Sequence, residues 1–175
     1  MNELIAKIEQ WAEDRNIIKG SKPIDQAMKL FSEFGELADN VGKGRDCRDD
    51  IGDVFVVLTI MAKQYGYPVS IHNSWDNRII YDLSVKSEKE MIVLLGVFLS
   101  NVSSSTVGAI KHLAAALTVL QFIAKEHNTT LEECVQIAYN DIKDRKGLMF
   151  NGVFIKESDP AYADVLKAIE ENYSA

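Results

Sequence analysis

A single apolar segment restricts how this chain can fold. Residues 51–62 have the sequence IGDVFVVLTIMA, in which apolar side chains fall on almost every side of a helix. A helix that is apolar all round is buried inside a protein. Asp53 is the exception within the segment, and a buried carboxylate is rare unless a cation or a metal ion neutralises it. The sequence therefore predicts a buried helix that carries an acidic group in need of a positive partner.

Two acidic pairs flank a short turn in this part of the chain. Glu33 and Glu36 form the first pair, and Asp50 and Asp53 form the second. A spacing of three residues places both members of a pair on one face of a helix. Residues 41–44, VGKG, stop the first helix, and two helices joined by such a turn pack antiparallel. We expect the four carboxylates to surround one small space.

These four carboxylates would repel one another, and each would raise the pKa of its neighbours. A hard divalent cation relieves that repulsion. Oxygen ligands suit Mg²⁺ or Mn²⁺, and Mg²⁺ commonly binds substrate phosphates as well. The pairs therefore predict a metal site for phosphate chemistry. The alternative is a solvated charged face, which the apolar surroundings of Asp53 disfavour.

The first helix of this hairpin is expected over residues 24–41 and has two distinct faces. Its apolar stripe contains Ala27, Leu30, Phe31, Phe34, Leu37, Ala38 and Val41. A second strip is polar and contains Gln26, Lys29, Glu33, Glu36 and Asn40. The acidic pair therefore belongs to a continuous polar lane along one side of the helix.

The rest of the chain favours an all-α fold. Helical periodicity and capping signals predict further helices over residues 3–15, 49–65, 87–101, 107–126 and 131–145, and a short one over 160–171. We expect loops or turns over residues 17–22, 69–87 and 103–105, and a hairpin or extended arm from residue 150. The predicted architecture is one helical domain over residues 1–175, built on the antiparallel helix hairpin with its four carboxylates.

Charge and cysteine content limit the partners. The formal net charge of −7 argues against binding of a nucleic acid polymer, because no basic face is available for the phosphate backbone. Cys47 and Cys134 lack metal-ligand spacing, so we expect free thiols in a reducing compartment. The N-terminal residues 1–15 are charged and amphipathic where a secretory signal would be apolar, and no apolar run approaches the length needed to span a bilayer. We therefore expect a cytoplasmic protein with no membrane partner.

A basic segment closes the helix predicted over residues 131–145. Residues 143–147 have the sequence KDRKG and supply Lys143, Arg145 and Lys146. Cations at a helix C-terminus complement its dipole, which is a purely structural role. Close to four carboxylates and a metal ion, the same cations would hold a polyphosphate. Both interpretations remain open on the sequence.

At these residues the chain resembles the MazG-like branch of the all-α nucleoside triphosphate pyrophosphohydrolases. That family shows the pattern EExxE followed by ExxD, matched here by residues 32–36 (SEFGE) and 50–53 (DIGD). Residues 9–15, Gln26, residues 140–147 and residues 151–157 also agree with it, so the match covers roughly residues 8–65 and 131–159. Three features depart from the family: Ser32 replaces a glutamate, Asp50 is one methylene shorter, and residues 66–130 are an insertion that adds a helical pair.

The resemblance implies a reaction and a set of roles. Mg²⁺-dependent hydrolysis of a nucleoside triphosphate between the α and β phosphates would give a monophosphate and pyrophosphate, as in housecleaning of the nucleotide pool. Glu33, Glu36, Asp50 and Asp53 would be the Mg²⁺ ligands, with Mn²⁺ as a substitute, and Glu33 would also accept the proton of the attacking water. Gln26, Asn140, Lys143 and Lys146 would contact the nucleotide.

Two other functions compete with this expectation. A di-iron carboxylate bundle needs Glu-x-x-His pairs, but His72, His112 and His127 follow Val69, Ala109 and Ala124 at that spacing. The di-iron alternative therefore fails. A non-catalytic helical interaction or regulatory module, whose acidic cluster binds metal only for structure, remains the rival.

The inserted helical pair is rich in apolar residues: Ile92, Leu94, Leu95, Val97, Phe98, Leu99, Leu113, Leu117, Leu120 and Phe122. Left uncovered, they would form a large exposed patch. We therefore expect part of this surface to be a subunit interface and the protein to be a homodimer.

Overall fold

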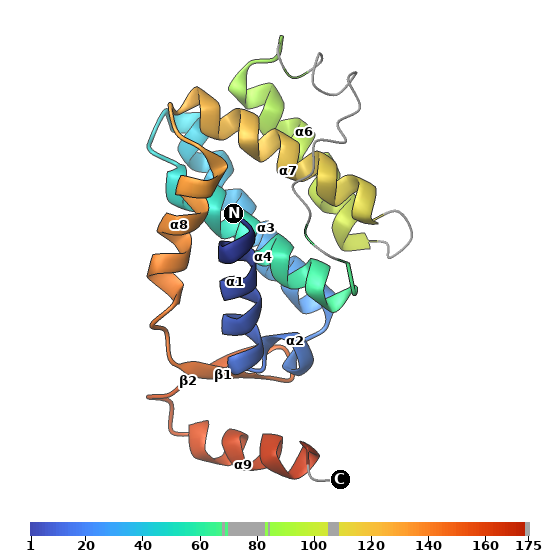
Figure 1. The fold of residues 1–175 in the computed structure, drawn as a ribbon, viewed down its shortest axis with the longest axis vertical. Helices are drawn as coiled ribbons and strands as arrows, with labels where there is room; N and C mark the ends of the chain where they lie inside the picture. Colours follow the sequence, from blue (N-terminus) through green and yellow to red (C-terminus); the bar gives the residue numbers. More distant parts are fainter. Residues whose placement is uncertain (68, 70–82, 84, 105–108, 174–175) are drawn as a thin grey trace.

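An antiparallel helix hairpin lies at the centre of the molecule (Figure 1). The computed structural model describes residues 1–67, 69, 83, 85–104 and 109–173. Helix α3 spans Pro23–Lys43 and ends at Gly44, whose positive φ of 64° lets its N–H bond back to carbonyls of the last turn. Helix α4 spans Arg48–Gln64 and is buried on nearly every side from residue 51 to residue 62, with Asp53 as the exception. The predicted buried helix is confirmed.

Three helices from distant parts of the sequence surround α4. They are α1 (Asn2–Asp14), the short α2 (Ile17–Gly20) and α8 (Leu131–Ile142). Helix α8 packs most closely at Gly52, where a Cβ atom would lie 2.3 Å from the carbonyl oxygen of Cys134. A larger residue at this position would push the two helices apart.

The inserted pair forms a second antiparallel layer, coloured green to yellow in Figure 1. Helix α6 (Glu88–Ser104) and helix α7 (Ala109–Glu126) pack on each other, α6 also contacts α3, and α7 also contacts α4. Most of the apolar residues expected to form an exposed patch are instead buried within the chain: Ile92, Leu95, Leu99, Leu113, Leu117 and Leu120. Leu94, Phe98 and Phe122 are half-buried against the same core.

A β-hairpin and a last helix complete the chain. Strand β1 (Gly147–Phe150) pairs antiparallel with β2 (Val153–Lys156), and α9 (Tyr162–Tyr173) lies beyond them. The hairpin is joined to the α1–α2 corner by backbone hydrogen bonds. The N–H of Met149 donates to Arg15 over 2.8 Å, and the N–H of Gly152 donates to Gly20 over 2.9 Å. This docking places the hairpin beside the end of the α3–α4 pair at which α3 begins and α4 ends.

The predicted all-α class is confirmed, because the described residues are mostly helical and their strands form one two-stranded sheet. Several predicted boundaries were wrong: α2 occupies part of an expected loop, α6 continues through Ser103 and Ser104, and α8 ends at Ile142. The connection predicted over residues 69–87 lies mostly outside the described residues. Within the described part of the chain, no helix is both long and apolar enough to cross a bilayer.

Candidate functional site

A cavity of about 620 Å³ opens between α1, α3, α4 and the β-hairpin. It lies where the polar lane of α3 faces Asp53 of α4, and the hairpin forms the opposite side. Its lining combines acidic, basic and apolar residues: Trp11, Ile17, Asp25, Gln26, Lys29, Glu33, Asp53, Val56, Val57, Ile60, Ile142, Arg145, Lys146, Met149, Gly152, Phe154 and Lys156. The mixture is typical of a site for a ligand that is itself part apolar and part charged.

Two carboxylates form the acidic side of this cavity. Glu33 is only 5% exposed and forms an ion pair with Lys29, one turn earlier on α3. Asp53 comes from α4, and its pKa is raised from 3.8 to about 7. Burial is the main cause, and the negative charges of Glu33 and Asp49 add to it. The two helices therefore hold like charges together in a poorly solvated place.

Asp49 is exposed and does not line the cavity, but it lies within electrostatic reach of Glu33 and Asp53, although the sequence pattern pointed to its neighbour Asp50. The pKa of Asp49 is raised by burial first and then by the charges of Asp141, Asp50 and Glu33. Asp49 precedes Asp53 by four residues, a spacing that also places two side chains on one helix face. That spacing was the available signal, and the match to the family pattern at Asp50 obscured it.

Cations form the opposite side. Arg145 and Lys146 follow α8, and Lys156 ends β2. The charge of Arg145 lowers the pKa of both Asp49 and Asp53, so it lies within electrostatic reach of the carboxylates. A polyanion in the cavity would meet several positive groups next to the acidic pair.

Arg15 and Trp11 position this basic segment. The Arg15 Nε–H donates to the carbonyl of Arg145 over 2.6 Å, and an NH2 group of Arg15 donates to the carbonyl of Lys143 over 3.0 Å. The Trp11 Nε1–H donates to the carbonyl of Ile142 over 2.8 Å, and the Arg15 guanidinium stacks 5.0 Å from the Trp11 ring. Helix α8 therefore ends where the side chains of Trp11 and Arg15 donate to carbonyls of residues 142–145, and Arg145 lines the cavity.

The structure divides the predicted site residues into two groups. Gln26, Glu33, Asp53 and Lys146 line the cavity, and Gln26 donates from Nε2 to the Ser21 hydroxyl over 2.9 Å. The remaining four residues do not line it: Glu36, Asp50, Asn140 and Lys143. Glu36, Asn140 and Lys143 are exposed, and Asp50 accepts a hydrogen bond of 2.8 Å from Asn40. The cavity also contains Arg145, which was expected among the cations that would hold a polyphosphate, and Lys29 and Lys156, which were not predicted as site residues.

Comparison with known proteins finds a similar protein in a bacteriophage. A protein of Haemophilus phage HP1 (strain HP1c1) is 33% identical over 163 residues, covering 79% of this chain and 97% of the phage protein. This chain belongs to the family of that phage protein. The relative is described as an uncharacterized 18.2 kDa protein in the rep-hol intergenic region. No protein-family model and no solved structure matches the chain.

The acidic side of the cavity has the donor chemistry for a hard divalent cation. Glu33 and Asp53 supply carboxylate oxygens in a setting where their negative charge is poorly solvated, which favours a cation of higher charge than Lys29. Among the described residues, the carboxylates of α3 and α4 do not bring three oxygens within 4.8 Å of one another. A Mg²⁺ ion at these two residues would therefore complete its coordination with water and substrate oxygens.

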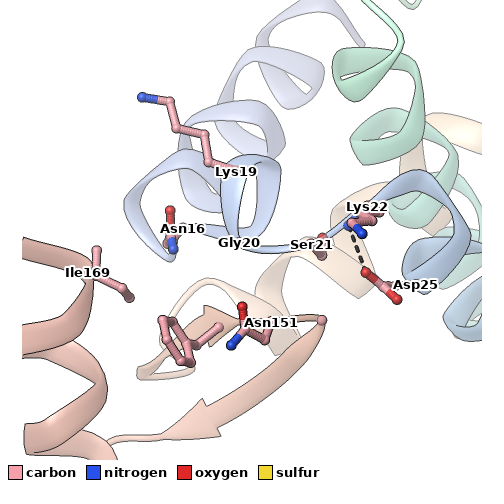
Figure 2. Close-up of a pocket in the computed structure, with 10 residues that line it drawn as sticks. Asn16, Lys19, Gly20, Ser21, Lys22, Asp25, Asn151 and Ile169 are labelled. Carbon is pink, nitrogen blue, oxygen red and sulfur yellow. Dashed lines mark hydrogen bonds between the residues drawn. The ribbon is translucent and has the colours of Figure 1, made fainter. Parts of the chain in front are cut away.

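A second, smaller cavity of about 370 Å³ adjoins the first at the β-hairpin turn (Figure 2). Asp25 and Gly152 line both cavities. Gly152 has a φ of 81°, and a Cβ atom there would lie 2.8 Å from Cγ of Asp25. The carboxylate of Asp25 accepts the backbone N–H of Lys22 over 2.7 Å. The hairpin turn therefore approaches the start of α3 closely, and glycine is needed there.

Proposed function

We propose that this protein is a Mg²⁺-dependent nucleoside triphosphate pyrophosphohydrolase that cleaves its substrate between the α and β phosphates. One observation carries the proposal: a single cavity presents a buried carboxylate pair, a set of cations and an apolar wall. A nucleoside triphosphate needs all three, because its base is apolar, its phosphates are anionic, and its metal ion needs oxygen ligands. The resemblance at Glu33 and Asp53, the two motif carboxylates that line the cavity, gives independent support from the sequence.

Each side of the cavity has a distinct part in binding. Arg145 and Lys146 would neutralise phosphate oxygens, with Lys156 adding charge from the hairpin. The base would pack against the apolar wall, where Trp11 and Phe154 offer aromatic surface. The hydrogen bonds from Arg15 keep the basic segment in place without contacting the substrate.

The chemistry would take place at the acidic side. When bound, Mg²⁺ neutralises charge on the phosphates and lowers the pKa of coordinated water. Glu33 and Asp53 would hold it, and Glu33 would also accept a proton from the attacking water, because its buried oxygens face the cavity. Lys29 would limit the repulsion between the two carboxylates in the free protein.

A product assay tests this function directly. The full chain is incubated with Mg²⁺ and each canonical triphosphate, dUTP and oxidised triphosphates, and the monophosphate and pyrophosphate are quantified. We expect the two products in equal amounts. Asp53→Asn should abolish turnover, because it removes a charge from the metal ligands without changing side-chain size. Asp164→Asn, on the exposed side of α9, is the matched control and should retain full activity.

Two outcomes would contradict the proposal. Release of orthophosphate would indicate a different cleavage position. Absence of turnover with every triphosphate, together with Mg²⁺ binding that Asp53→Asn removes, would favour the non-catalytic module with a structural metal.

A further inference from the structure

Three potential metal ligands meet near the turn that joins α3 and α4. This end of the helix pair is the one opposite the β-hairpin. Cys47 precedes the first turn of α4, Glu88 is the first residue of α6, and His127 directly follows α7. The Cys47 Sγ lies 3.2 Å from the His127 Nε2, and the same nitrogen lies 2.5 Å from the Glu88 Oε1. All three donor atoms lie within 4.8 Å of one another.

Two groups compete for the Nε2 atom of His127 in this cluster. A single imidazole nitrogen either donates one proton or accepts one, so Nε2 cannot serve both the thiol and the carboxylate at once. If Nε2 carries a proton for Glu88, it has no lone pair for the thiol of Cys47. If Nε2 accepts a hydrogen bond from the thiol, it carries no proton of its own. It then has no hydrogen bond to donate to the carboxylate of Glu88. A cation bound by all three atoms removes this conflict.

A nucleophilic cysteine is also a poor explanation. A Cys–His–acid catalytic arrangement uses one imidazole nitrogen for the thiol and the other for the orienting carboxylate. Here both groups approach Nε2, and the Cys47 residue is fully buried, with a relative exposure of 0%. Substrate therefore has no access to the sulfur.

We propose that Cys47, Glu88 and His127 form a Zn²⁺ site that is separate from the cavity and joins the inserted helical pair to the α3–α4 hairpin. Thiolate, imidazole and carboxylate together are ligands that Zn²⁺ takes and that Mg²⁺ does not prefer. Three protein ligands leave the fourth tetrahedral position to water. The side chains of His127 and Glu88 are 21% and 28% exposed, which gives a solvent ion a route to the site.

The surrounding charge favours a cation here. The carboxylates of Glu88, Asp50 and Asp46 lie close enough to Cys47 to interact with it electrostatically. Asp46 lies close enough to His127 for the two groups to interact electrostatically. A divalent ion would offset these negative charges and bind the sulfur as thiolate, with release of a proton.

Cobalt substitution tests the site with a signal that a carboxylate site does not give. The full chain is stripped of metal with a chelator and titrated with Co²⁺, and the thiolate-to-cobalt charge-transfer absorption is followed in the near ultraviolet. We expect saturation at one Co²⁺ per chain, displacement by Zn²⁺, and a higher melting temperature with Zn²⁺.

Matched variants assign the signal to these residues. Cys47→Ser should eliminate the charge-transfer band. His127→Gln and Glu88→Gln should each raise the Kd for Co²⁺ by roughly a hundredfold or more, since loss of even an outer-shell partner commonly costs 10–100-fold. Cys134→Ala, which removes the other buried cysteine, should keep the band, and so should Asp53→Asn in the proposed catalytic site.

Either of two results would overturn the proposal. One is a wild-type protein without the band at saturating Co²⁺. The other is a band whose affinity is unchanged in both His127→Gln and Glu88→Gln. The Glu88 variant keeps the test decisive if Cys47→Ser fails to fold, because Glu88 lies partly in solvent.

Discussion

Asp53 is placed where its charge opposes folding. Its pKa is raised from 3.8 to about 7, so between these values the folded state keeps a proton that the unfolded state has lost. Stability of the metal-free protein should therefore fall as pH rises from about 4 to about 7, and stay low above that range. The full shift corresponds to about 4 kcal/mol, and solvent screening reduces the expected loss to the order of 2 kcal/mol.

Urea unfolding at several pH values in the presence of a chelator measures this loss. Asp53→Asn is the comparison, because it removes the titrating group and keeps the shape. We expect the variant to be more stable than the wild type at pH 8 and to lose less stability between pH 4 and pH 8. If the free energy of unfolding changed equally with pH in the two proteins, the charge of Asp53 would be compensated in the folded state. That outcome would contradict the prediction.

The basic segment after α8 contains residues with different surroundings. Lys146 and Arg145 line the cavity, whereas Lys143 is exposed outside it. Lys146→Ala and Arg145→Ala should each lower kcat/KM by roughly tenfold or more, because each removes a charged hydrogen bond to phosphate. Lys143→Ala should cost only about 0.3–1 kcal/mol of stability, through loss of a cation at the end of a helix.

Steady-state kinetics beside thermal melts separate these effects. The informative contrast is between Lys143 and Lys146, which the sequence placed together. An equal loss of kcat/KM in both variants would mean that residues 143–147 move when the substrate binds. Their positions in the ligand-free protein would then differ from those in the complex.

At the scale of helices, the contact between α4 and α8 depends on Gly52. A Cβ atom at this position would lie 2.3 Å from the carbonyl oxygen of Cys134 and 2.7 Å from the Cβ of Ala138. Gly52→Ala should therefore destabilise the protein by about 1–3 kcal/mol, because a backbone cannot move aside as a flexible side chain can. Urea unfolding followed by circular dichroism gives the change.

Gly42 provides the matched control for this substitution. It lies in the last turns of α3, and no atom lies within 4 Å of the position of an added Cβ. Gly42→Ala should stabilise the protein by about 0.5–1 kcal/mol, since alanine restricts the unfolded chain more than glycine does. Similar effects at both positions would refute the close contact at Gly52.

The helices were predictable where local pattern decides them, and less so where distant residues intervene. The hairpin followed from apolar periodicity and the glycine stop. Helix α6 ran past its expected end because the Ser103 hydroxyl donates to the carbonyl of Leu99 over 2.8 Å, which lets serine remain in a helix. Helix α8 stopped early because Trp11 and Arg15 donate hydrogen bonds to the carbonyls of Ile142 and Lys143, and these distant partners cannot be seen in the local sequence.

The chemistry of the site was predictable from the sequence, but the full set of residues that form it was not. Glu33 and Asp53 follow from helical spacing and from the apolar run around Asp53. The choice between Asp49 and Asp50 depends on the rotation of α4 about its axis, which the packing of α8 and α3 determines. Lys156 enters the cavity only because the β-hairpin docks on the α1–α2 corner, and no short-range pattern encodes that docking.

The assembly state belongs to the whole molecule. Burial of Leu95 and Leu99 within the chain removes part of the surface expected at an interface, but Val93 and Val97 remain 71% and 52% exposed one turn apart on α6. We still expect a homodimer, now through this exposed face of α6. Light scattering at micromolar concentration should give twice the mass of the chain, and Val97→Glu should halve it.

Thr130→Ser is a suitable control for this experiment, because the conservative change keeps the hydroxyl cap at the start of α8 and leaves α6 untouched. A wild-type protein with the mass of one chain would mean that the inserted pair completes the helical bundle without a second subunit.

The hydrogen bond from Trp11 to Ile142 joins residues 131 positions apart, which has a consequence for the order of synthesis. The ribosome makes α3 and α4, with Glu33 and Asp53, long before it makes Arg145, Lys146 and Lys156. A nascent chain that ends within α8 therefore has the negative side of the cavity without Arg145, Lys146 and Lys156. Chaperones and proteases would meet a chain whose acidic groups are still partly open to water, and release of the C-terminal part from the exit tunnel would complete the enclosure.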